Sequence, residues 1–138
     1  MKVIVVGYDG TEPAKRALER AAELSKAFGA RVIVASVAPL LIGATGRGIG
    51  PYDPVDPPEE HRAQLAEAEQ LLAELGVQPE VQLAVGAPPR EIAEIAETHA
   101  ADLIVVGTRD LGFFERLLGL SVSDGVVHRA HCDVLIVH

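Results

Sequence analysis

Leu103-Ile104-Val105-Val106-Gly107-Thr108-Arg109 is the stretch that decides the fold, together with Ser121-Val122-Ser123-Asp124 and Asp133-Val134-Leu135-Ile136-Val137 after it. The two apolar runs predict buried strands, and the hydroxyl residues between them predict the start of a short helix. We expect Gly107 to let the backbone turn sharply where the strand ends, and the two serines to present free helix N–H groups to an anion. Strand, loop, helix and strand in this order are typical of a nucleotide site.

Apolar runs without alternation recur along the chain, which is typical of strands in a parallel sheet covered on both faces. They lie at residues 3–6, 32–37, 81–85, 103–106 and 134–137. Helical patterns lie between them, over 11–29, over about 59–75, from 88 onward and after 121. The alternation predicts one doubly wound α/β domain over 1–138, with right-handed crossovers and a five-stranded parallel sheet in the flavodoxin-like order 3-2-1-4-5.

The periodicity of the helical patterns indicates which side chains face the core. Thr11 is a good N-cap for the first helix, and Gly29 is a good terminator. The first helix is expected to bury Ala14, Ala17, Leu18, Ala21, Ser25 and Phe28; the second Leu65, Ala68, Leu72 and Leu75; the third Ile92, Ile95 and Ala96; the fourth Val122, Val126 and Val127.

Ligands of doubly wound sheets bind where the strand order reverses, beyond the carboxyl ends of the central strands. In the order 3-2-1-4-5 these are the first and fourth strands. The residues at their ends, Tyr8-Asp9-Gly10 and Gly107-Thr108-Arg109, are therefore expected to face each other across a ligand crevice.

The segment 38–58 is rich in glycine and proline and predicts an irregular loop. Its glycines, in Gly43-Ala44-Thr45-Gly46-Arg47-Gly48-Ile49-Gly50, are not followed by the Gly-Lys-Ser/Thr of a phosphate loop, and no helical pattern opens directly after them. We interpret the segment as a flexible flap or partner-contact loop. A primary phosphate cradle is the alternative.

Composition and charge narrow the classes of function. The 138 residues suit one domain with a core of Val, Ile, Leu and Ala, since 49% of the chain is hydrophobic and 4% aromatic. A net charge of -8 at pH 7 argues against nonspecific binding to nucleic acid or to an anionic membrane. No apolar run is long enough for a membrane helix, and residues 1–9 predict a strand rather than a signal peptide, so we expect a cytoplasmic protein.

The cysteine and the histidines offer no recognisable reactive or metal-binding pattern. Cys132 precedes an apolar strand and is interpreted as a small buried residue, not a nucleophile. The histidines have no ligand-like partner at a recognisable spacing, so no metal site is predicted, and all five are expected at the solvated surface. They are His61, His99, His128, His131 and His138.

Four motifs are distributed along nearly the whole chain, from residue 5 to residue 137. They are Val5-Val6-Gly7-Tyr8-Asp9-Gly10-Thr11-Glu12, Gly86-Ala87-Pro88, the stretch 101–109 and the stretch 130–137. They resemble the first strand and Asp-Gly-Ser/Thr turn, the third crossover, the fourth strand and the last strand of the universal stress protein family, with Asp133 where proline is usual. The resemblance implies adenine-nucleotide binding and an antiparallel homodimer along the last strand, Asp133 to Val137, which as an apolar sheet edge also invites pairing.

ATP-binding members of that family carry Gly-x-x-Gly, nine residues, then Gly-Ser/Thr, and this chain departs from the pattern. Gly107 and Ser121 hold the first glycine and the hydroxyl, but Asp110 and Leu120 stand where the other glycines belong. A carboxylate at 110 repels a triphosphate, and a branched side chain at 120 adds bulk where the backbone must approach phosphate. The nearby Gly119 would serve only after a one-residue slip, which moves the serine out of register.

The resemblance also implies which residues would contact a nucleotide. Asp9, beside Tyr8, would face the nucleoside, and the adenine would lie against the second strand near Val37. The residues flanking the ribose and the phosphates would be Val106, Gly107, Arg109, Ser121, Val122 and Ser123.

Some of these residues also suit a structural role. Asp9 is a common residue for bracing a turn, and Ser121 can be a helix N-cap with no ligand bound. Arg109 can pair with Asp110 or Glu115 instead of phosphate. Both kinds of role stay open for these residues.

Two functions are weighed for a member of this family: a stress-response module that binds ATP with slow or no hydrolysis, and a regulatory or binding module whose degenerate site binds ATP weakly or not at all. AMP is a further possible ligand. A phosphoacceptor receiver domain fails, since no acidic pair follows the first strand and no Lys ends the fifth. The crevice offers one carboxylate, Asp9, and no nucleophile with a base, so no catalytic residue and no enzyme activity are predicted. The lost glycines favour the degenerate site.

Overall fold

The computed structural model describes residues 1–38, 58–108 and 122–138, with the backbone alone for 58 and 122–124. The elements are β1 (Val3–Gly7), α1 (Glu12–Phe28), β2 (Arg31–Ala38), α2 (Pro58–Glu74), β3 (Glu80–Val85), α3 (Pro88–Thr98), β4 (Leu103–Gly107), α5 (Val122–Arg129) and β5 (Asp133–Val137). Ala38 extends the second strand and Pro58 begins the second helix, so the predicted loop is shorter at both ends. Its remainder, 39–57, lies outside the described residues.

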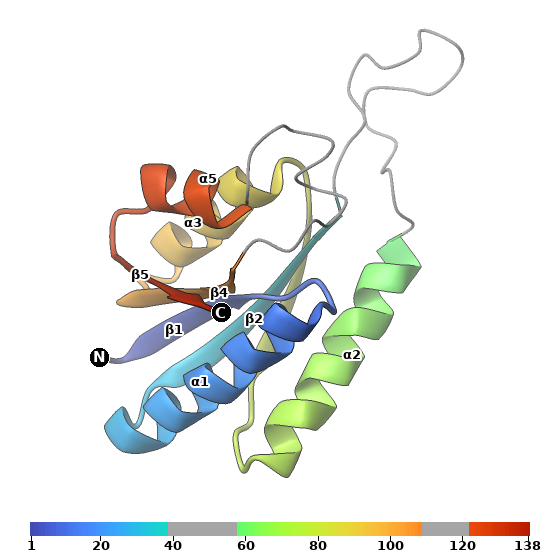
Figure 1. The fold of residues 1–138 in the computed structure, drawn as a ribbon, viewed down its shortest axis with the longest axis vertical. Helices are drawn as coiled ribbons and strands as arrows, with labels where there is room; N and C mark the ends of the chain where they lie inside the picture. Colours follow the sequence, from blue (N-terminus) through green and yellow to red (C-terminus); the bar gives the residue numbers. More distant parts are fainter. Residues whose placement is uncertain (39–57, 109–121) are drawn as a thin grey trace, which may run out of the picture.

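The sheet confirms the predicted topology. Its strands run in the order β3-β2-β1-β4-β5, and every neighbouring pair is parallel. The central pair places Ile4 opposite Leu103 and Val6 opposite Val105. Helices α1 and α2 cover one face of the sheet, while α3 and α5 cover the other (Figure 1).

Two apolar clusters, one on each face, follow from the alternation of side chains along the strands. The cluster under α1 and α2 includes Ile4, Val6, Val34 and Val105, and the cluster under α3 and α5 includes Val5, Ile33, Val37, Ile104 and Val106. Apart from Tyr8, the buried side chains of both clusters are aliphatic, as the composition predicts.

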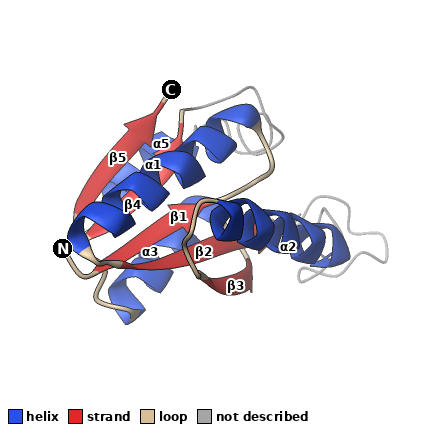
Figure 2. Cartoon of the chain, turned by 90° about the horizontal axis from the view of Figure 1, so that it is seen from below, coloured by secondary structure: helices blue, strands red, loops and turns tan. Residues whose placement is uncertain are grey.

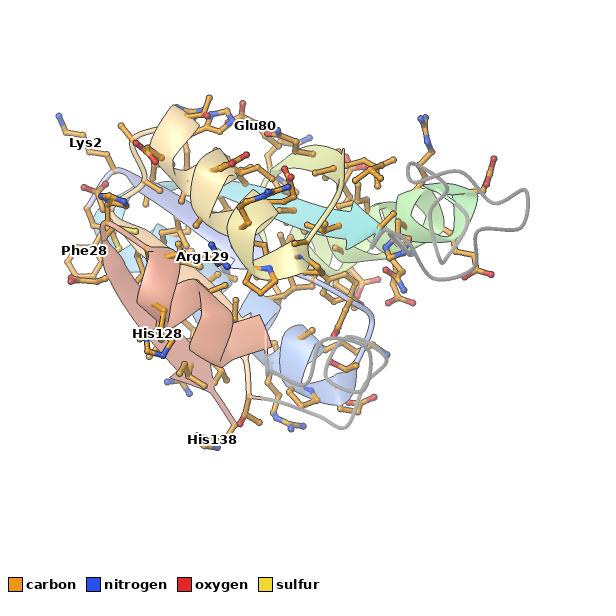
Figure 3. All side chains as sticks on the ribbon, turned by 90° about the horizontal axis from the view of Figure 1, so that it is seen from above. Lys2, Phe28, Glu80, His128, Arg129 and His138 are labelled. Carbon is orange, nitrogen blue, oxygen red and sulfur yellow. The ribbon has the colours of Figure 1, made fainter. Side chains whose placement is uncertain are left out.

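Helix α1 shows how the local sequence starts and ends an element. The Thr11 side chain accepts a hydrogen bond from the Ala14 backbone N–H at 3.3 Å, which confirms the predicted N-cap. Gly29 ends the helix at φ 69°, and its N–H donates to the Ser25 carbonyl at 2.7 Å. The predicted burial of Phe28 is wrong, since this side chain is 59% exposed (Figure 3). The last turn of α1 contains no buried residue, because the helix extends beyond the part that the core covers.

The other helices bury the predicted positions that the structure describes, except Leu75 and Val127. Leu75 is half-buried and follows the end of α2 at Glu74, and the side chain of Val122 is not described. Leu65, Leu72 and Ile92 are among the core side chains. Val127 of α5 was expected to face inward but is 48% exposed. Its predecessor Val126 is fully buried, and successive helical residues point about 100° apart. The helix therefore turns Val127 outward.

The expectation that all strands are covered on both faces is wrong for β3, which forms one edge of the sheet, with β5 at the other (Figure 2). Val81 and Val85 of β3 are 40% and 43% exposed. An edge strand has a neighbouring strand on one side only, so its side chains are shielded less than those of β1 or β4. Within the described segments, no helix is long and apolar enough to cross a membrane.

Candidate functional site

The candidate site lies at the carboxyl ends of β1 and β4, which pair directly with each other. The chain leaves β1 into α1, whereas α5 lies on the opposite face of the sheet from α1 (Figure 1). In doubly wound proteins, ligands bind beyond the strand ends where the chain passes to helices on opposite faces of the sheet in this way. The Tyr8 N–H donates to the Ala35 carbonyl at 2.9 Å, and the Thr108 N–H to the Val137 carbonyl at 2.6 Å. These bonds hold both rim segments to the neighbouring strands.

Asp9 braces the turn between β1 and α1. Its Oδ1 accepts from the Thr11 backbone N–H at 3.0 Å and from the Thr11 hydroxyl at 2.6 Å. The turn-bracing interpretation of Asp9 is therefore confirmed, and both bonds use the same carboxylate oxygen. The Asp9 carboxylate is thus held in one orientation beyond the carboxyl end of β1.

Tyr8 contributes its backbone, not its side chain, to the rim. The side chain is 3% exposed and belongs to the cluster under α1 and α2. Its hydroxyl donates a hydrogen bond to a carboxylate oxygen of Glu67 on α2. Burial, and after it the Glu67 carboxylate, raise the pKa of Tyr8 above its ordinary value.

Gly107 is required by packing and not by a sharp turn. Its φ is not positive, in contrast to Gly10, Gly29, Gly76 and Gly86. A Cβ at position 107 would lie 2.7 Å from the carbonyl carbon of Pro13 and 2.8 Å from the nitrogen of the next residue. The predicted reason for this glycine is therefore corrected: it lets the end of β4 approach the first turn of α1.

Val37 and Val106 bring apolar surface to the same side of the sheet. They are 4% and 3% exposed, and both belong to the cluster under α3 and α5. Arg109, Ser121 and the two departures from the glycine motif lie outside the described residues. Val122 and Ser123 lie in the first turn of α5, where the structure describes the backbone alone.

Polar residues of α2 that were not predicted from the sequence also lie near these strand ends. The surface prediction is wrong for His61, which is 2% exposed, and Ser36, on β2, is fully buried beside it. The distance from His61 Nδ1 to Ser36 Oγ is 2.9 Å. A signal existed, since His61 shares the helical spacing of the buried Leu65, Ala68 and Leu72.

The remaining predictions on titratable residues have mixed outcomes. His128, His131 and His138 are exposed as predicted, whereas His99 is half-buried and lies 3.1 Å from Gln82 Oε1 through its Nε2. Cys132 is half-buried, and burial raises the pKa of its thiol, which lowers the share of reactive thiolate. In the parts of the chain that the structure describes, no group of three or more potential ligand side chains is placed to hold a metal ion.

The strand order defines an α/β protein of the adenine-nucleotide α-hydrolase type. The chain belongs to the universal stress protein family, whose family model matches residues 1–138. It is 34% identical to a universal stress protein of Methanocaldococcus jannaschii over 99% of this chain and 81% of that protein. It is 36% identical to one from Thermus aquaticus over 99% of this chain and 98% of the relative.

Two solved structures of similar proteins were determined with nucleotides. One is a universal stress protein in complex with cAMP, at a TM-score of 0.74 and 34% identity, covering 99% of this chain and 96% of the other. The second is the universal stress protein from Archaeoglobus fulgidus in complex with dAMP, at a TM-score of 0.73 and 26% identity, covering 100% of this chain and 98% of the other.

Proposed function

We propose that the protein is a regulatory module that binds adenine nucleotides with one phosphate in preference to ATP. The observation that carries the proposal is Asp110. This carboxylate stands where the glycine motif of ATP-binding family members has its second glycine. Leu120 replaces a further glycine of that pattern. The similar proteins solved with cAMP and dAMP support a monophosphate ligand for this family member.

The electrostatics of the described rim support the same preference. Residues 8–11 follow β1 and residue 108 follows β4. Among these described residues, the charged side chain is Asp9. Its carboxylate suits hydrogen bonds from a ribose or a base, but it repels phosphate. A triphosphate carries more negative charge than a monophosphate, so carboxylates at 9 and 110 disfavour ATP more than AMP.

Calorimetry with AMP, cAMP and ATP tests the proposal. One carboxylate facing a phosphate at a few ångströms costs about 1 to 4 kcal/mol, or roughly one to three decades in affinity. The unmodified protein should therefore bind AMP more tightly than ATP. Asp110→Gly with Leu120→Gly should raise ATP affinity much more than AMP affinity. The two substitutions border the same phosphates, so their effects should not simply add.

Asp110→Asn is the matched control, because it removes the charge without restoring a glycine. It should recover the electrostatic part of the ATP affinity, most visibly at low salt, where screening is weakest. Tighter binding of ATP than of AMP by the unmodified chain would overturn the proposal and restore an intact ATP site.

We infer that the protein works by binding and not by dedicated catalysis. Ser36 and His61 form a serine–histidine pair, but at 0% and 2% exposure a substrate does not reach them. The Thr11 hydroxyl, which donates to Asp9, also accepts a helix N–H as an N-cap. Purified protein incubated with ATP should release phosphate no faster than a matched Asp9→Asn variant, and a clear difference would contradict this inference.

A homodimer along β5 is the partner that we propose. The residues of β5 pair with β4 on one side, and this strand forms an edge of the sheet. The apolar residues at 134–136 are half-buried, and an apolar edge strand favours pairing with a second chain. Sedimentation at micromolar concentration should show a dimer that Leu135→Lys or Ile136→Pro weakens, with circular dichroism to confirm that each variant is folded. A monomer for the unmodified chain would contradict the proposal.

A further inference from the structure

Three polar side chains of α2, spaced three residues apart, reach the ends of β1 and β2. Residues at this spacing lie on one side of a helix, so they form one line, which we call the polar line. Its members are His61, Gln64 and Glu67. Their contacts are His61 Nδ1 with Ser36 Oγ at 2.9 Å, Gln64 Nε2 donating to the Asp9 carbonyl at 3.2 Å, and Glu67 accepting from the Tyr8 hydroxyl.

Packing alone does not account for the polar line. Ser36 continues the alternation of Val32 and Val34 on β2, and His61 continues the buried stripe of α2, so apolar side chains would fit both patterns. A buried polar pair loses its hydration, and replacing both partners with apolar groups of the same shape is often nearly neutral. These two residues therefore point to a requirement beyond core stability.

The contacts of His61 and Gln64 connect into one chain of hydrogen bonds that ends at Asp9. The Ser36 hydroxyl donates to Gln64 Oε1 at 3.4 Å, and the amide nitrogen of the same glutamine donates to the Asp9 carbonyl at 3.2 Å. A Cβ on Gly10, whose φ is +82°, would lie 3.4 Å from that amide nitrogen. Gln64 therefore packs directly on the turn that carries the Asp9 carboxylate.

Asp9 is thus held from two directions. Thr11 fixes the carboxylate, and Gln64 fixes the backbone carbonyl of the same residue. Ser36 also stands next to Val37, the residue against which the adenine is expected. The chain of contacts accordingly ends on Asp9 and adjoins Val37 along β2, and the family resemblance assigns both residues to the nucleoside.

We propose that Gln64, supported by Ser36 and His61, is a positioning residue that orients Asp9 toward the nucleoside. Helix α2 then belongs to the binding site even though its own side chains bond to the protein and not to the ligand. The inference rests on the proposed function for the ligand, while the effect on the turn can be measured in the ligand-free protein.

The variant Gln64→Met tests this role, because methionine keeps the length of the side chain and removes its hydrogen-bonding groups. The matched control is Gln70→Met, the same change at an exposed position of the same helix. Adenosine and AMP are titrated by calorimetry into each variant. Gln64→Met should weaken both by the same factor, about two- to tenfold for one lost hydrogen bond, and leave their affinity ratio unchanged. Gln70→Met should change neither.

Amide hydrogen exchange without ligand separates this inference from the proposed function. The Thr11 N–H, which donates to Asp9, should exchange about two- to tenfold faster in Gln64→Met and at an unchanged rate in Gln70→Met. An unchanged exchange rate of the Thr11 N–H in Gln64→Met, or a loss of affinity confined to AMP, overturns the positioning role. Faster exchange in a protein that binds neither adenosine nor AMP supports the positioning role and overturns the proposed function.

Discussion

Replacing Gly107 by alanine tests whether the end of β4 is limited by the backbone of α1. The new Cβ would lie 2.7 Å and 2.8 Å from backbone atoms of Pro13 and Ala14. Backbone atoms in the capped first turn of a helix cannot rotate away, so β4 and α1 must separate. Overpacking of this kind costs about 1–3 kcal/mol.

Gly7→Ala is the matched comparison, because Gly7 ends the neighbouring strand β1 and also has no positive φ. Its new Cβ would lie 2.9 Å from Ile92 Cδ1 and 3.2 Å from Val106 Cγ1, which are side-chain ends. Moving such an end off its rotamer costs about 0.5–1.5 kcal/mol. Replacing glycine by alanine also lowers the entropy of the unfolded chain, which stabilises the protein by about 0.4–1 kcal/mol. This effect is the same in both variants and cancels in the comparison.

Urea unfolding of the two variants measures the difference. We expect Gly107→Ala to be less stable than Gly7→Ala by about 1–2 kcal/mol, which is a midpoint shift on the order of 0.5–1 M at equal slopes. An equal or larger loss for Gly7→Ala would refute the steric account. Gly107 would then have to be explained by its place beside the ligand.

Three further predictions follow from single contacts. Gly125→Ala should lower the thermal midpoint despite a helix-propensity gain of about 1 kcal/mol, because its Cβ would lie 2.6 Å from the ring of Pro89; a stabilised variant would contradict this. The Asp102 carboxylate accepts hydrogen bonds from the backbone N–H groups of Lys2 and Val3 at 2.7 and 3.0 Å, and these bonds lower its pKa, so its contribution to stability should be lost as pH falls through the folded-state pKa. Urea midpoints against pH should accordingly fall less in acid for Asp102→Asn than for the unmodified chain. Because the pKa of Tyr8 is raised in the folded protein, the contribution of Tyr8 to folding stability is present below the ordinary pKa of about 10 and is lost as pH rises above it. The chain has two tyrosines, so Tyr52→Phe leaves Tyr8 as the only phenol. Ultraviolet titration of this variant should show no Tyr8 phenolate until the protein unfolds.

Much of the fold is contained in local patterns. The apolar runs placed every strand, and the Thr11 cap and Gly29 terminator bounded α1, because these features depend on neighbours in the sequence. Gly107 and His61 could not be interpreted in this way. The space at Gly107 is set by Pro13, far away in the chain, and the environment of His61 by Ser36 on β2. Such requirements exist only after the helices pack on the sheet.

The same limit applies to the candidate site. The strand order, which the structure confirms, places the expected ligand position beyond the ends of β1 and β4, since topology alone determines it. The role of Asp9 in its turn was one of two predicted alternatives, and the contact with Thr11 was needed to establish it. Gln64 escaped notice because a half-buried glutamine within an amphipathic helix has no distinctive local pattern.

The pairing of β1 with β4 has a consequence for synthesis on the ribosome. Strand β1 can pair with β2 early in synthesis, but its other flank has no partner until β4 has been made. About 70 residues separate the ends of β2 and β4. At about 5–20 residues per second, that flank stays unpaired for roughly 4 to 14 s. The strand that becomes the centre of the native sheet is therefore, for this interval, an open edge of the nascent chain, and it is then most exposed to misassociation with other chains.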